Sequence, residues 1–325
     1  MPFTLSLADI EAARAQIAPH VKRTPLARSD VLSRRLGTNV YLKAELFQKT
    51  GSFKVRGAFN KMLRLTPEER AAGVAAVSGG NHAQAVAYVA QMLGIRAVLF
   101  MPETTPRNYV DATLGYGAEI IFVRAVNEGF ELLDQYAAKG WAPVHPFKDV
   151  LVMAGAGTTG LEIIEDVPDI TDCIVSIGGG GLISGVSTAI KACLPSTRIW
   201  GVETEGADCM SRALAAGKPV MMPAITSMAK TLGAPSASDE TLSIVQRDVE
   251  SVTVVSDNEA LAALRFLLER TKMLTELAAS CTLVAAEKLR DRFGPDHHVV
   301  LLLCGGNMAV ADLCQALATR PIPSM

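Results

Sequence analysis

The chain has 325 residues, of which 49% are hydrophobic and 20% charged, and its formal net charge is −2. A chain of this length and composition buries a large core and forms one large or two medium domains. The near balance of charge, with no long basic block, argues against nucleic acid as the main partner. No apolar stretch reaches the ~18 residues that a membrane helix needs, so we expect no membrane partner.

The N-terminal segment and the cysteines bear on the compartment. The first residues, MPFTLS, have no basic region followed by a long apolar core and do not resemble a secretory signal. The six cysteines form no Cys-x-x-Cys pair and show no regular spacing, which argues against a disulfide framework or a structural zinc site. We therefore expect a cytoplasmic protein.

Apolar strands alternate with helices along much of the chain. This pattern indicates an α/β fold of mostly parallel, doubly wound sheets with helices on both sides. In chain order we expect a strand at 74–77, a helix at 82–93, strands at 96–101 and 118–123, a helix at 127–139, a strand at 174–177, a helix at 182–194, strands at 198–203 and 299–304, and a last helix.

Two domains are expected from this order of elements. We place a small domain at about 71–150, inserted into a large domain built from residues 1–70 plus 151–325. Right-handed crossovers bring the turns after parallel strands to one edge of a sheet, where ligands bind. Glycine-rich turns at 78–81, 178–181 and 305–307 all follow predicted strands.

Four successive glycines, Gly178–Gly181, follow the apolar run 173–177. Without Cβ atoms, a strand-to-helix turn lets a ligand approach the backbone, and its amides converge on an anion at the helix N-terminus. No Gly-Lys-Ser/Thr follows, so the stretch is not a nucleotide P-loop. It predicts a phosphate-binding turn, and the alternative is a merely flexible turn.

A second motif, KTGSFKVRGA at 49–58, contains Lys54. Ser52 is a reasonable N-cap, and apolar residues recur at helical spacing from Val55, so a helix is expected to begin here. Lys54 then lies in the first turn, where the helix dipole lowers the pKa of an amine, as an imine-forming lysine requires. The alternative is a solvated lysine opposite the apolar stripe of the helix.

Four motifs follow one another along the chain: KTGSFKVRGA at 49–58, SGGNHAQ at 78–84, GGGGLISG at 178–185 and CGGN at 304–307. Together they resemble the serine/threonine dehydratase and serine racemase family of pyridoxal-phosphate (PLP) enzymes, which have the tryptophan-synthase-β-like fold. The resemblance covers nearly the whole chain, from Thr24 to the C-terminal helix.

The resemblance implies a role for each motif. Lys54 would form the Schiff base with PLP, Phe53 would pack near its ring, Asn81 would hydrogen-bond the ring hydroxyl, and Cys304 would lie beside the pyridine nitrogen. Residues of the tetraglycine run would hold the cofactor phosphate: Gly178, Gly179, Gly180 and Gly181. Residues of the asparagine loop would bind the substrate carboxylate at a helix N-terminus: Ser78, Gly79, Gly80, Asn81 and His82.

Cys304 has a consequence for the chemistry. A thiol with a pKa near ~8.5 is neutral at pH 7, so it offers the pyridine nitrogen no counter-charge. The ring is then a weaker electron sink, and loss of a β-substituent suits it better than a long-lived carbanion. The alternative is that Cys304 is only a small buried apolar residue.

Three positions depart from the family pattern. Gly79 stands where the racemases carry the serine that acts on the cofactor face opposite the lysine, so racemisation should be weak or absent. Leu277 follows Glu276 where the family usually has Glu-Pro, so the turn after Glu276 is expected to differ. Lys230 stands in place of an acidic residue that faces the substrate; it either suits a substrate with a second carboxylate or is solvated.

Some relatives bind a divalent cation in the loop after the strand at 198–203. Glu203, Ala207 and Asp208 match part of that site, and Cys209 takes the place of a second acidic ligand. Because hard cations prefer oxygen ligands, a Mg²⁺ or Ca²⁺ site is one expectation and a solvated acidic loop the other.

We therefore expect a PLP-dependent dehydratase that eliminates water from a hydroxyamino acid such as L-threonine or L-serine. Alternatives are a 3-hydroxyaspartate dehydratase, a serine racemase and a non-catalytic PLP-fold binding protein. The expected partner is a small amino-acid substrate, and the expected assembly is a homodimer or homotetramer.

A match to Gly-x-Gly-x-x-Gly at 155–160 offers a rival interpretation as a dinucleotide-binding dehydrogenase. It favours such an enzyme only weakly, because no acidic residue follows at the required distance. In the family that the chain resembles, this stretch is a turn that opens a helix of the large domain.

Overall fold

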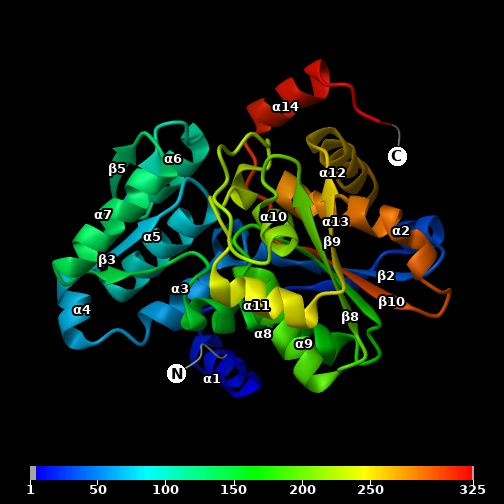
Figure 1. The fold of residues 1–325 in the computed structure, drawn as a ribbon, viewed down its shortest axis with the longest axis horizontal. Helices are drawn as coiled ribbons and strands as arrows, with labels where there is room; N and C mark the ends of the chain where they lie inside the picture. Colours follow the sequence, from blue (N-terminus) through cyan, green and yellow to red (C-terminus); the bar gives the residue numbers. More distant parts are fainter. Residues whose placement is uncertain (1–4, 324–325) are drawn as a thin grey trace.

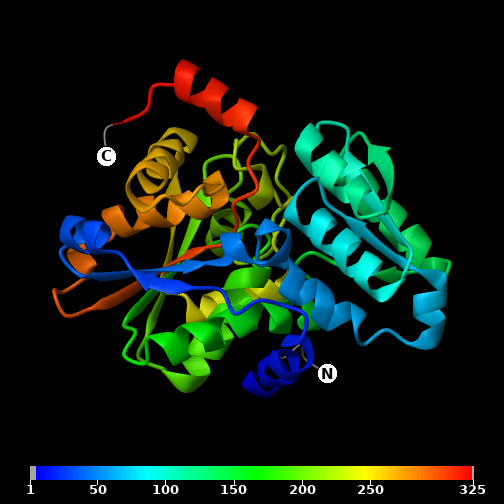
Figure 2. The same cartoon turned by 180° about the vertical axis from the view of Figure 1, so that it is seen from behind.

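The computed structural model describes residues 5–323 and contains two sheets that lie side by side (Figures 1 and 2). The larger sheet has six strands in the order β1-β2-β10-β7-β8-β9. All neighbours pair in parallel except β1 and β2. The strands are β1 (Leu26–Arg28), β2 (Asn39–Ala44), β7 (Asp172–Ser176), β8 (Arg198–Thr204), β9 (Ser251–Val255) and β10 (His298–Leu303).

Helices cover both faces of the larger sheet, which explains why its central strands are apolar throughout. One face packs against α13, with α12 beyond it, and α2 lies against β2 at the edge. The other face carries α8 and α9, with α1 and α11 outside them (Figure 1). These helices are α1 (Leu7–Ile17), α2 (Asp30–Leu36), α8 (Val150–Asp166), α9 (Gly181–Cys193), α11 (Asp239–Asp248), α12 (Asp257–Thr271) and α13 (Leu277–Lys288).

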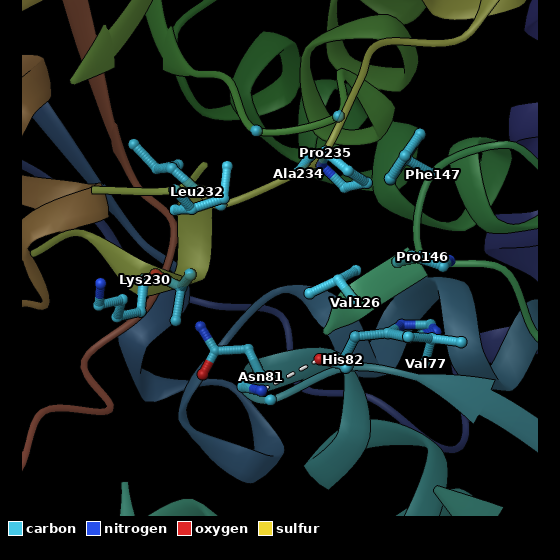
Figure 3. A pocket seen from close by; sticks show the side chains of 18 of the residues that line it. Val77, Asn81, His82, Val126, Pro146, Phe147, Lys230, Leu232, Ala234 and Pro235 are labelled. Atoms are coloured by element: carbon cyan, nitrogen blue, oxygen red, sulfur yellow. Dashed lines mark hydrogen bonds between the residues drawn. The ribbon is translucent and has the colours of Figure 1, made fainter. Parts of the chain in front are cut away.

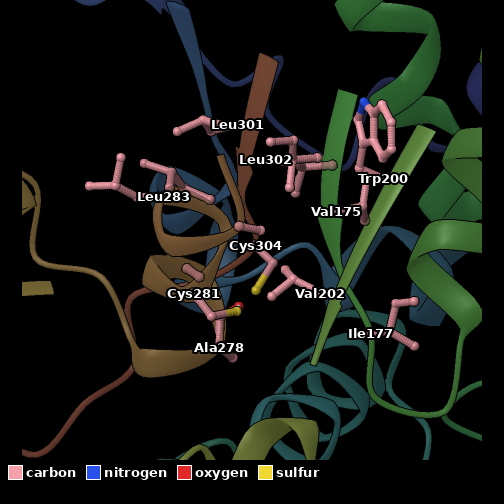
Figure 4. Close-up of a cluster of buried hydrophobic side chains, with 14 of the residues drawn as sticks. Val175, Ile177, Trp200, Val202, Ala278, Cys281, Leu283, Leu301, Leu302 and Cys304 are labelled. Carbon is pink, nitrogen blue, oxygen red and sulfur yellow. The ribbon is translucent and has the colours of Figure 1, made fainter. Parts of the chain in front are cut away.

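The core of the larger sheet is apolar and reaches the carboxyl end of β10. Cys304 and Cys281 lie there beside Val202 and Ala278 (Figure 4). Two further α-helices lie at the periphery, α10 (Cys209–Ala216) and α14 (Val310–Thr319). Short 3-10 turns occur at Glu45–Phe47, Lys49–Gly51, Lys230–Leu232 and Arg290–Arg292.

The smaller sheet has four parallel strands in the order β5-β4-β3-β6. They are β3 (Val74–Val77), β4 (Ala97–Pro102), β5 (Glu119–Val123) and β6 (Ala142–Pro143). Helices α5 (Asn81–Leu93), α6 (Arg107–Gly115) and α7 (Val126–Ala138) pack around this sheet, while α3 (Lys54–Met62) and α4 (Pro67–Ala72) precede it. Because α3 contacts both α5 and α8, it joins the two parts.

The sequence-predicted elements all occur, with ends within two residues of those observed. The α/β class with mostly parallel sheets is therefore confirmed, and the three glycine-rich turns follow β3, β7 and β10 at the carboxyl ends of the strands. The domain boundaries at 70/71 and 150/151 stay a prediction, and the separate four-stranded sheet at 74–143 supports them.

The Gly-x-Gly-x-x-Gly match at 155–160 lies inside α8, and our expectation that it opens a helix was wrong. Its glycines allow close helix packing instead. A Cβ on Gly155 would come within 2.5 Å of the Arg56 carbonyl oxygen, and one on Gly157 within 2.8 Å of the Gly185 carbonyl oxygen. Backbone contact of this kind leaves no space for a dinucleotide.

No helix in the described part of the chain combines the length and the apolar composition needed to cross a bilayer.

Candidate active site

A cavity of about 490 Å³ lies where the carboxyl ends of the two sheets face each other. Residues of the small sheet form one wall and residues of the large sheet the other. Figure 3 shows Asn81 and His82 on one side, with Lys230, Leu232 and Ala234 across the cavity. The predicted cofactor and substrate residues all line this cavity: Phe53, Lys54, Ser78, Gly79, Gly80, Asn81, His82, Gly178, Gly179, Gly180, Gly181 and Cys304.

Lys54 is the first residue of α3, and its amine lies inside the cavity. The Nζ atom donates a hydrogen bond to the Pro146 carbonyl oxygen at 3.0 Å and lies 5.1 Å from the centre of the Phe53 ring. Burial lowers the pKa of Lys54 from 10.5 to about 8, against the opposing influence of Cys304 and Glu276. Burial is the main cause of the lowered pKa, and the half-buried position of Lys54 at the cavity wall favours the imine-forming role over a solvated surface lysine.

The predicted N-cap of this helix was wrong by one residue. Phe53 occupies the N-cap position, and the Ser52 side chain makes no cap hydrogen bond. Ser52 instead forms a β-bridge with Gly305, and the Phe53 amide donates to the Cys304 carbonyl oxygen at 3.1 Å. These contacts hold the segment that precedes Lys54 against the end of β10.

The tetraglycine turn ends β7 and begins α9, with Gly180 at the N-cap and at φ 96°. A Cβ on Gly179 would lie 2.3 Å from the Phe147 ring, and one on Gly178 would lie 3.0 Å from the Leu232 carbonyl oxygen. The turn accepts no side chain there, so its backbone stays open toward the cavity. The first amides of a 13-residue helix then lack internal acceptors and favour an anion.

A chain of hydrogen bonds holds the Asn81 amide. Its Nδ2 donates to both Glu276 carboxylate oxygens, at 2.8 and 3.0 Å, and its Oδ1 accepts from Asn307 Nδ2 at 2.8 Å. Thr231 Oγ1 also donates to Glu276, at 3.1 Å. Asn307 was not among the predicted site residues, although the CGGN motif contains it.

Burial raises the pKa of Glu276 to about 7, against the hydrogen bonds from Asn81 and Thr231 that lower it. The same burial raises the pKa of the Cys304 thiol well above its ordinary value. Ser176 Oγ donates to Cys304 Sγ at 3.4 Å. Burial therefore favours the neutral thiol at Cys304, which agrees with the neutral form expected from the ordinary pKa of a thiol.

The asparagine loop leads from β3 into α5, with Gly80 at the N-cap. The Ser78 hydroxyl accepts from the Gly80 amide at 3.1 Å, which tightens the loop. The His82 Nε2–H donates to the Val144 carbonyl oxygen at 2.8 Å. Burial lowers the pKa of His82 to about 3, so its ring is neutral and the loop offers backbone amides rather than charge.

Comparison with known proteins explains this arrangement. The family model described as "pyridoxal-phosphate dependent enzyme" matches residues 17–305. The chain belongs to this family.

Individual members of the PLP-dependent family are also similar over most of the chain. An L-threonine ammonia-lyase from Geobacter sulfurreducens is 40% identical, covering 96% of this chain and 77% of that protein. A catabolic L-threonine dehydratase from Staphylococcus aureus is 40% identical, covering 94% and 89%.

Solved structures agree with these sequence relatives. Maize serine racemase superposes with a TM-score of 0.91 at 34% identity, covering 97% of this chain and 98% of that one. The processed form of threonine deaminase isoform 2 from Solanum lycopersicum superposes with a TM-score of 0.88 at 31% identity, covering 96% and 86%. The tryptophan-synthase-β-like fold predicted from the motifs is thereby confirmed.

The cavity fits PLP in the way expected of a PLP-dependent enzyme. A half-buried lysine amine of lowered pKa faces the cavity, and a neutral thiol lies on its wall. A glycine turn with no space for Cβ atoms forms one end of the cavity. The dianionic phosphate suits the N-terminus of α9, and the amine of Lys54 suits the aldehyde.

Two departures from the family pattern have visible structural outcomes. Glu276 is the N-cap of α13 and Leu277 its first residue, a position where proline is also favoured, so Leu277 leaves the helix start in place. Lys230 is exposed at the cavity wall, and Arg124 is exposed on the small-domain side of the same cavity.

The predicted cation ligands lie outside the cavity. Glu203 is fully buried and accepts hydrogen bonds from the Met210 and Ser211 amides, both at 2.8 Å, and from the Ser211 hydroxyl. Burial raises its pKa to about 7. Residues 5–323 hold no group of three or more His, Cys, Asp or Glu side chains suited to a metal ion. A role for Glu203 and Ala207 in binding Mg²⁺ or Ca²⁺ therefore stays a prediction.

Proposed function

We propose that this protein is a PLP-dependent dehydratase that eliminates water from L-threonine or L-serine to give a 2-oxo acid and ammonia. The observation that carries the proposal is the half-buried Lys54 amine, with a pKa lowered to about 8, in one cavity with the tetraglycine turn and the neutral Cys304 thiol. The threonine ammonia-lyase relatives, 40% identical over most of the chain, support the same reaction.

Lys54 has two tasks in this reaction: it would hold PLP through its amine, and it moves the proton of the substrate α-carbon. When bound, PLP supplies an electron sink conjugated to the substrate α-carbon. The neutral Lys54 amine takes the proton from Cα, and the Lys54 ammonium so formed returns a proton to the β-hydroxyl, which departs from Cβ as water. The enamine product released from the site then hydrolyses to the 2-oxo acid and ammonia. A lysine with a pKa near the working pH suits this proton transfer.

The neighbours of the cofactor ring favour elimination over racemisation. Since burial keeps the Cys304 thiol protonated, it offers no negative charge to stabilise a protonated ring nitrogen. Electron density at Cα is then best discharged at once through loss of the β-hydroxyl. Gly79 also brings no hydroxyl of its own, so the racemase alternative has less support.

A dicarboxylic hydroxyamino acid is the second candidate substrate. Lys230 and Arg124 both line the cavity, whereas Glu276 is the sole acidic residue among the described lining residues, and it hydrogen-bonds Asn81 and Thr231. This distribution of charge favours a second substrate carboxylate near the cavity mouth. A 3-hydroxyaspartate meets that requirement.

A keto-acid and ammonia assay over a panel of hydroxyamino acids tests the function. The panel holds L- and D-threonine, L- and D-serine and both 3-hydroxyaspartate diastereomers. We expect turnover of L-threonine or L-serine; turnover of the dicarboxylates alone would assign Lys230 and Arg124 to substrate binding. No keto acid from any member would reject the reaction class and leave a non-catalytic binding protein.

The cation, the assembly and the compartment stay predictions. Melting curves with EDTA, Mg²⁺ and Ca²⁺ test whether a cation stabilises the loop at Glu203 and Ala207, because a bound ligand raises the apparent stability. Light scattering of the purified protein distinguishes the predicted homodimer from the homotetramer. Fractionation of the source cell tests the predicted cytoplasmic location.

A further inference from the structure

Thr105 carries a buried hydroxyl that the mechanism above does not use. The residue lies in the turn between β4 and α6, where its amide donates to the Pro102 carbonyl oxygen at 2.9 Å. It lines the cavity, and its Oγ1 has no hydrogen-bond partner in the described part of the chain. Buried hydroxyls nearly always have a partner, and this one lies at the cavity wall with its donor free for a group bound in the cavity.

The Thr105 hydroxyl faces the asparagine loop at Gly79. A Cβ built on Gly79 would lie 2.6 Å from Thr105 Oγ1 and 3.6 Å from Thr105 Cβ. The hydroxyl is thus the nearest part of the side chain, and a residue larger than glycine at position 79 would displace it. The absence of a side chain at position 79 is what allows Thr105 to reach this point.

The other groups around Gly79 leave room for a carboxylate. Helix α5 begins at Asn81, and the first amides of a helix have no internal acceptor. The Asn81 amide group is engaged with Glu276 and Asn307, and the His82 ring is engaged with Val144 and neutral. An anion at this loop therefore meets backbone amides and the Ser78 hydroxyl, and the Thr105 hydroxyl is a further donor from outside the loop.

We propose that the Thr105 hydroxyl donates a hydrogen bond to the substrate carboxylate held beside Gly79. The proposal deepens the proposed function, on whose substrate site it rests, and it assigns a binding residue from outside the asparagine loop. The resemblance to known enzymes pointed only to the loop itself. The hydrogen bond orients the carboxylate and stabilises ground state and transition state alike.

The test compares holoenzyme variants Thr105→Val and Thr105→Ser. Valine has the shape of threonine without the hydroxyl, and serine restores the hydroxyl. The first readout is the Kd of L-alanine, from the absorbance change of the bound cofactor, because L-alanine has the carboxylate and no leaving group. We expect Thr105→Val to raise this Kd by about 10- to 100-fold, as loss of a hydrogen bond to a charged group does.

Further readouts separate binding from folding. The KM for L-serine should rise with the alanine Kd while kcat stays within a few-fold, because uniform binding is lost. PLP affinity and melting temperature should be unchanged in Thr105→Val, and Thr105→Ser should bind L-alanine nearly as the unmutated protein does.

An unchanged L-alanine Kd in Thr105→Val would overturn the proposal. Weaker binding of hydroxyamino acids alone would also overturn it, because the hydroxyl would then contact the β-hydroxyl group. If the unmutated protein binds L-alanine in a Thr105-dependent way and yet releases no keto acid from any substrate, the proposed function fails and this assignment stands.

Discussion

Lys54 shows how burial changes the chemistry of one residue. An ordinary lysine with a pKa of 10.5 is almost wholly protonated at neutral pH, whereas a pKa of about 8 leaves about one amine in ten neutral at pH 7. Position in a helix turn pointed to the residue, but the size of the effect comes from the closed cavity around it. That cavity is made by segments distant in the chain, including Pro146 and Phe147.

The rate at which PLP recombines with the apoprotein should follow the neutral amine of Lys54. Because its pKa is lowered, the neutral form increases with rising pH and is complete above about pH 9. We expect a recombination rate that rises about tenfold per pH unit below 8 and then levels off. Stopped-flow absorbance between pH 6 and 10 measures it, and a rise that continues through pH 10 would show an unshifted lysine.

Racemisation should be slow because Gly79 has no hydroxyl and Thr105 is engaged with the carboxylate. With L-serine in D₂O, we expect D-serine to form at about 1% of the elimination rate or less, since positioned acid–base catalysis is missing.

The single variant Gly79→Ser must displace the Thr105 hydroxyl, which would lie 2.6 Å from the new Cβ. The double variant Gly79→Ser/Thr105→Ala makes the space and should racemise faster. Abundant D-serine from the unmutated protein would refute this account.

The turn between β7 and α9 depends on close packing along its whole length. Gly179 touches Phe147, Gly178 approaches the segment of Leu232, and Gly180 has a positive φ. The two contacts exclude a side chain at Gly178 and Gly179, and the positive φ disfavours one at Gly180. The amides at the start of α9 therefore stay open to the cavity. Four glycines in the sequence indicated the open backbone, whereas the neighbours that demand it are visible only in three dimensions.

Gly179→Ala should therefore weaken PLP binding. The added Cβ meets the Phe147 ring at 2.3 Å, so the turn or the ring must move. We expect the PLP dissociation constant to rise by about 10- to 100-fold, in line with overpacking costs of about 1–3 kcal/mol. Gly115→Ala, where an added Cβ meets nothing within 4 Å, is the control. Equal PLP affinity in both variants would contradict the phosphate assignment.

Helix α3 is anchored below the site by a buried ion cluster. Arg56 is 1% exposed and binds Glu45, at 2.8 and 2.9 Å, and Glu162, at 2.7 and 2.9 Å, while Lys43 binds Glu162 at 2.6 Å. Burial alone would lower the pKa of Arg56, but the carboxylates of Glu45 and Glu162 raise it by more, so the net shift is upward. The cluster holds the helix that carries Lys54.

Arg56→Met should destabilise the protein strongly. It leaves two carboxylates in a buried place without their main partner, which typically costs about 3–5 kcal/mol. Arg14→Met is the matched control, because Arg14 pairs with Glu165 in an exposed bridge whose loss costs about 1 kcal/mol or less. Urea unfolding of both variants measures the difference, and equal loss of stability would refute an anchoring role.

Across the molecule, the sequence predicted the parallel α/β class, the glycine turns and the lysine, because each is encoded by local pattern or a contiguous motif. Contacts between distant segments were not predictable in this way. Asn307 orients Asn81 across 226 positions, and Thr105 approaches Gly79 from a separate turn. The glycines at 155 and 157 were wrongly expected to open a helix for the same reason, since the segments that they pack against lie on α3 and α9.

The central claim is that this cavity is a PLP site in which Lys54 holds the cofactor, and borohydride reduction of the whole holoprotein tests it most directly. Reduction makes the bond between lysine and cofactor permanent, so the intact mass should rise by one reduced PLP group. Peptide mapping should place that group on Lys54, and Lys54→Ala should show neither the added mass nor the visible absorbance of bound cofactor. Labelling at another lysine, or an unaltered absorbance band in Lys54→Ala, would contradict the account.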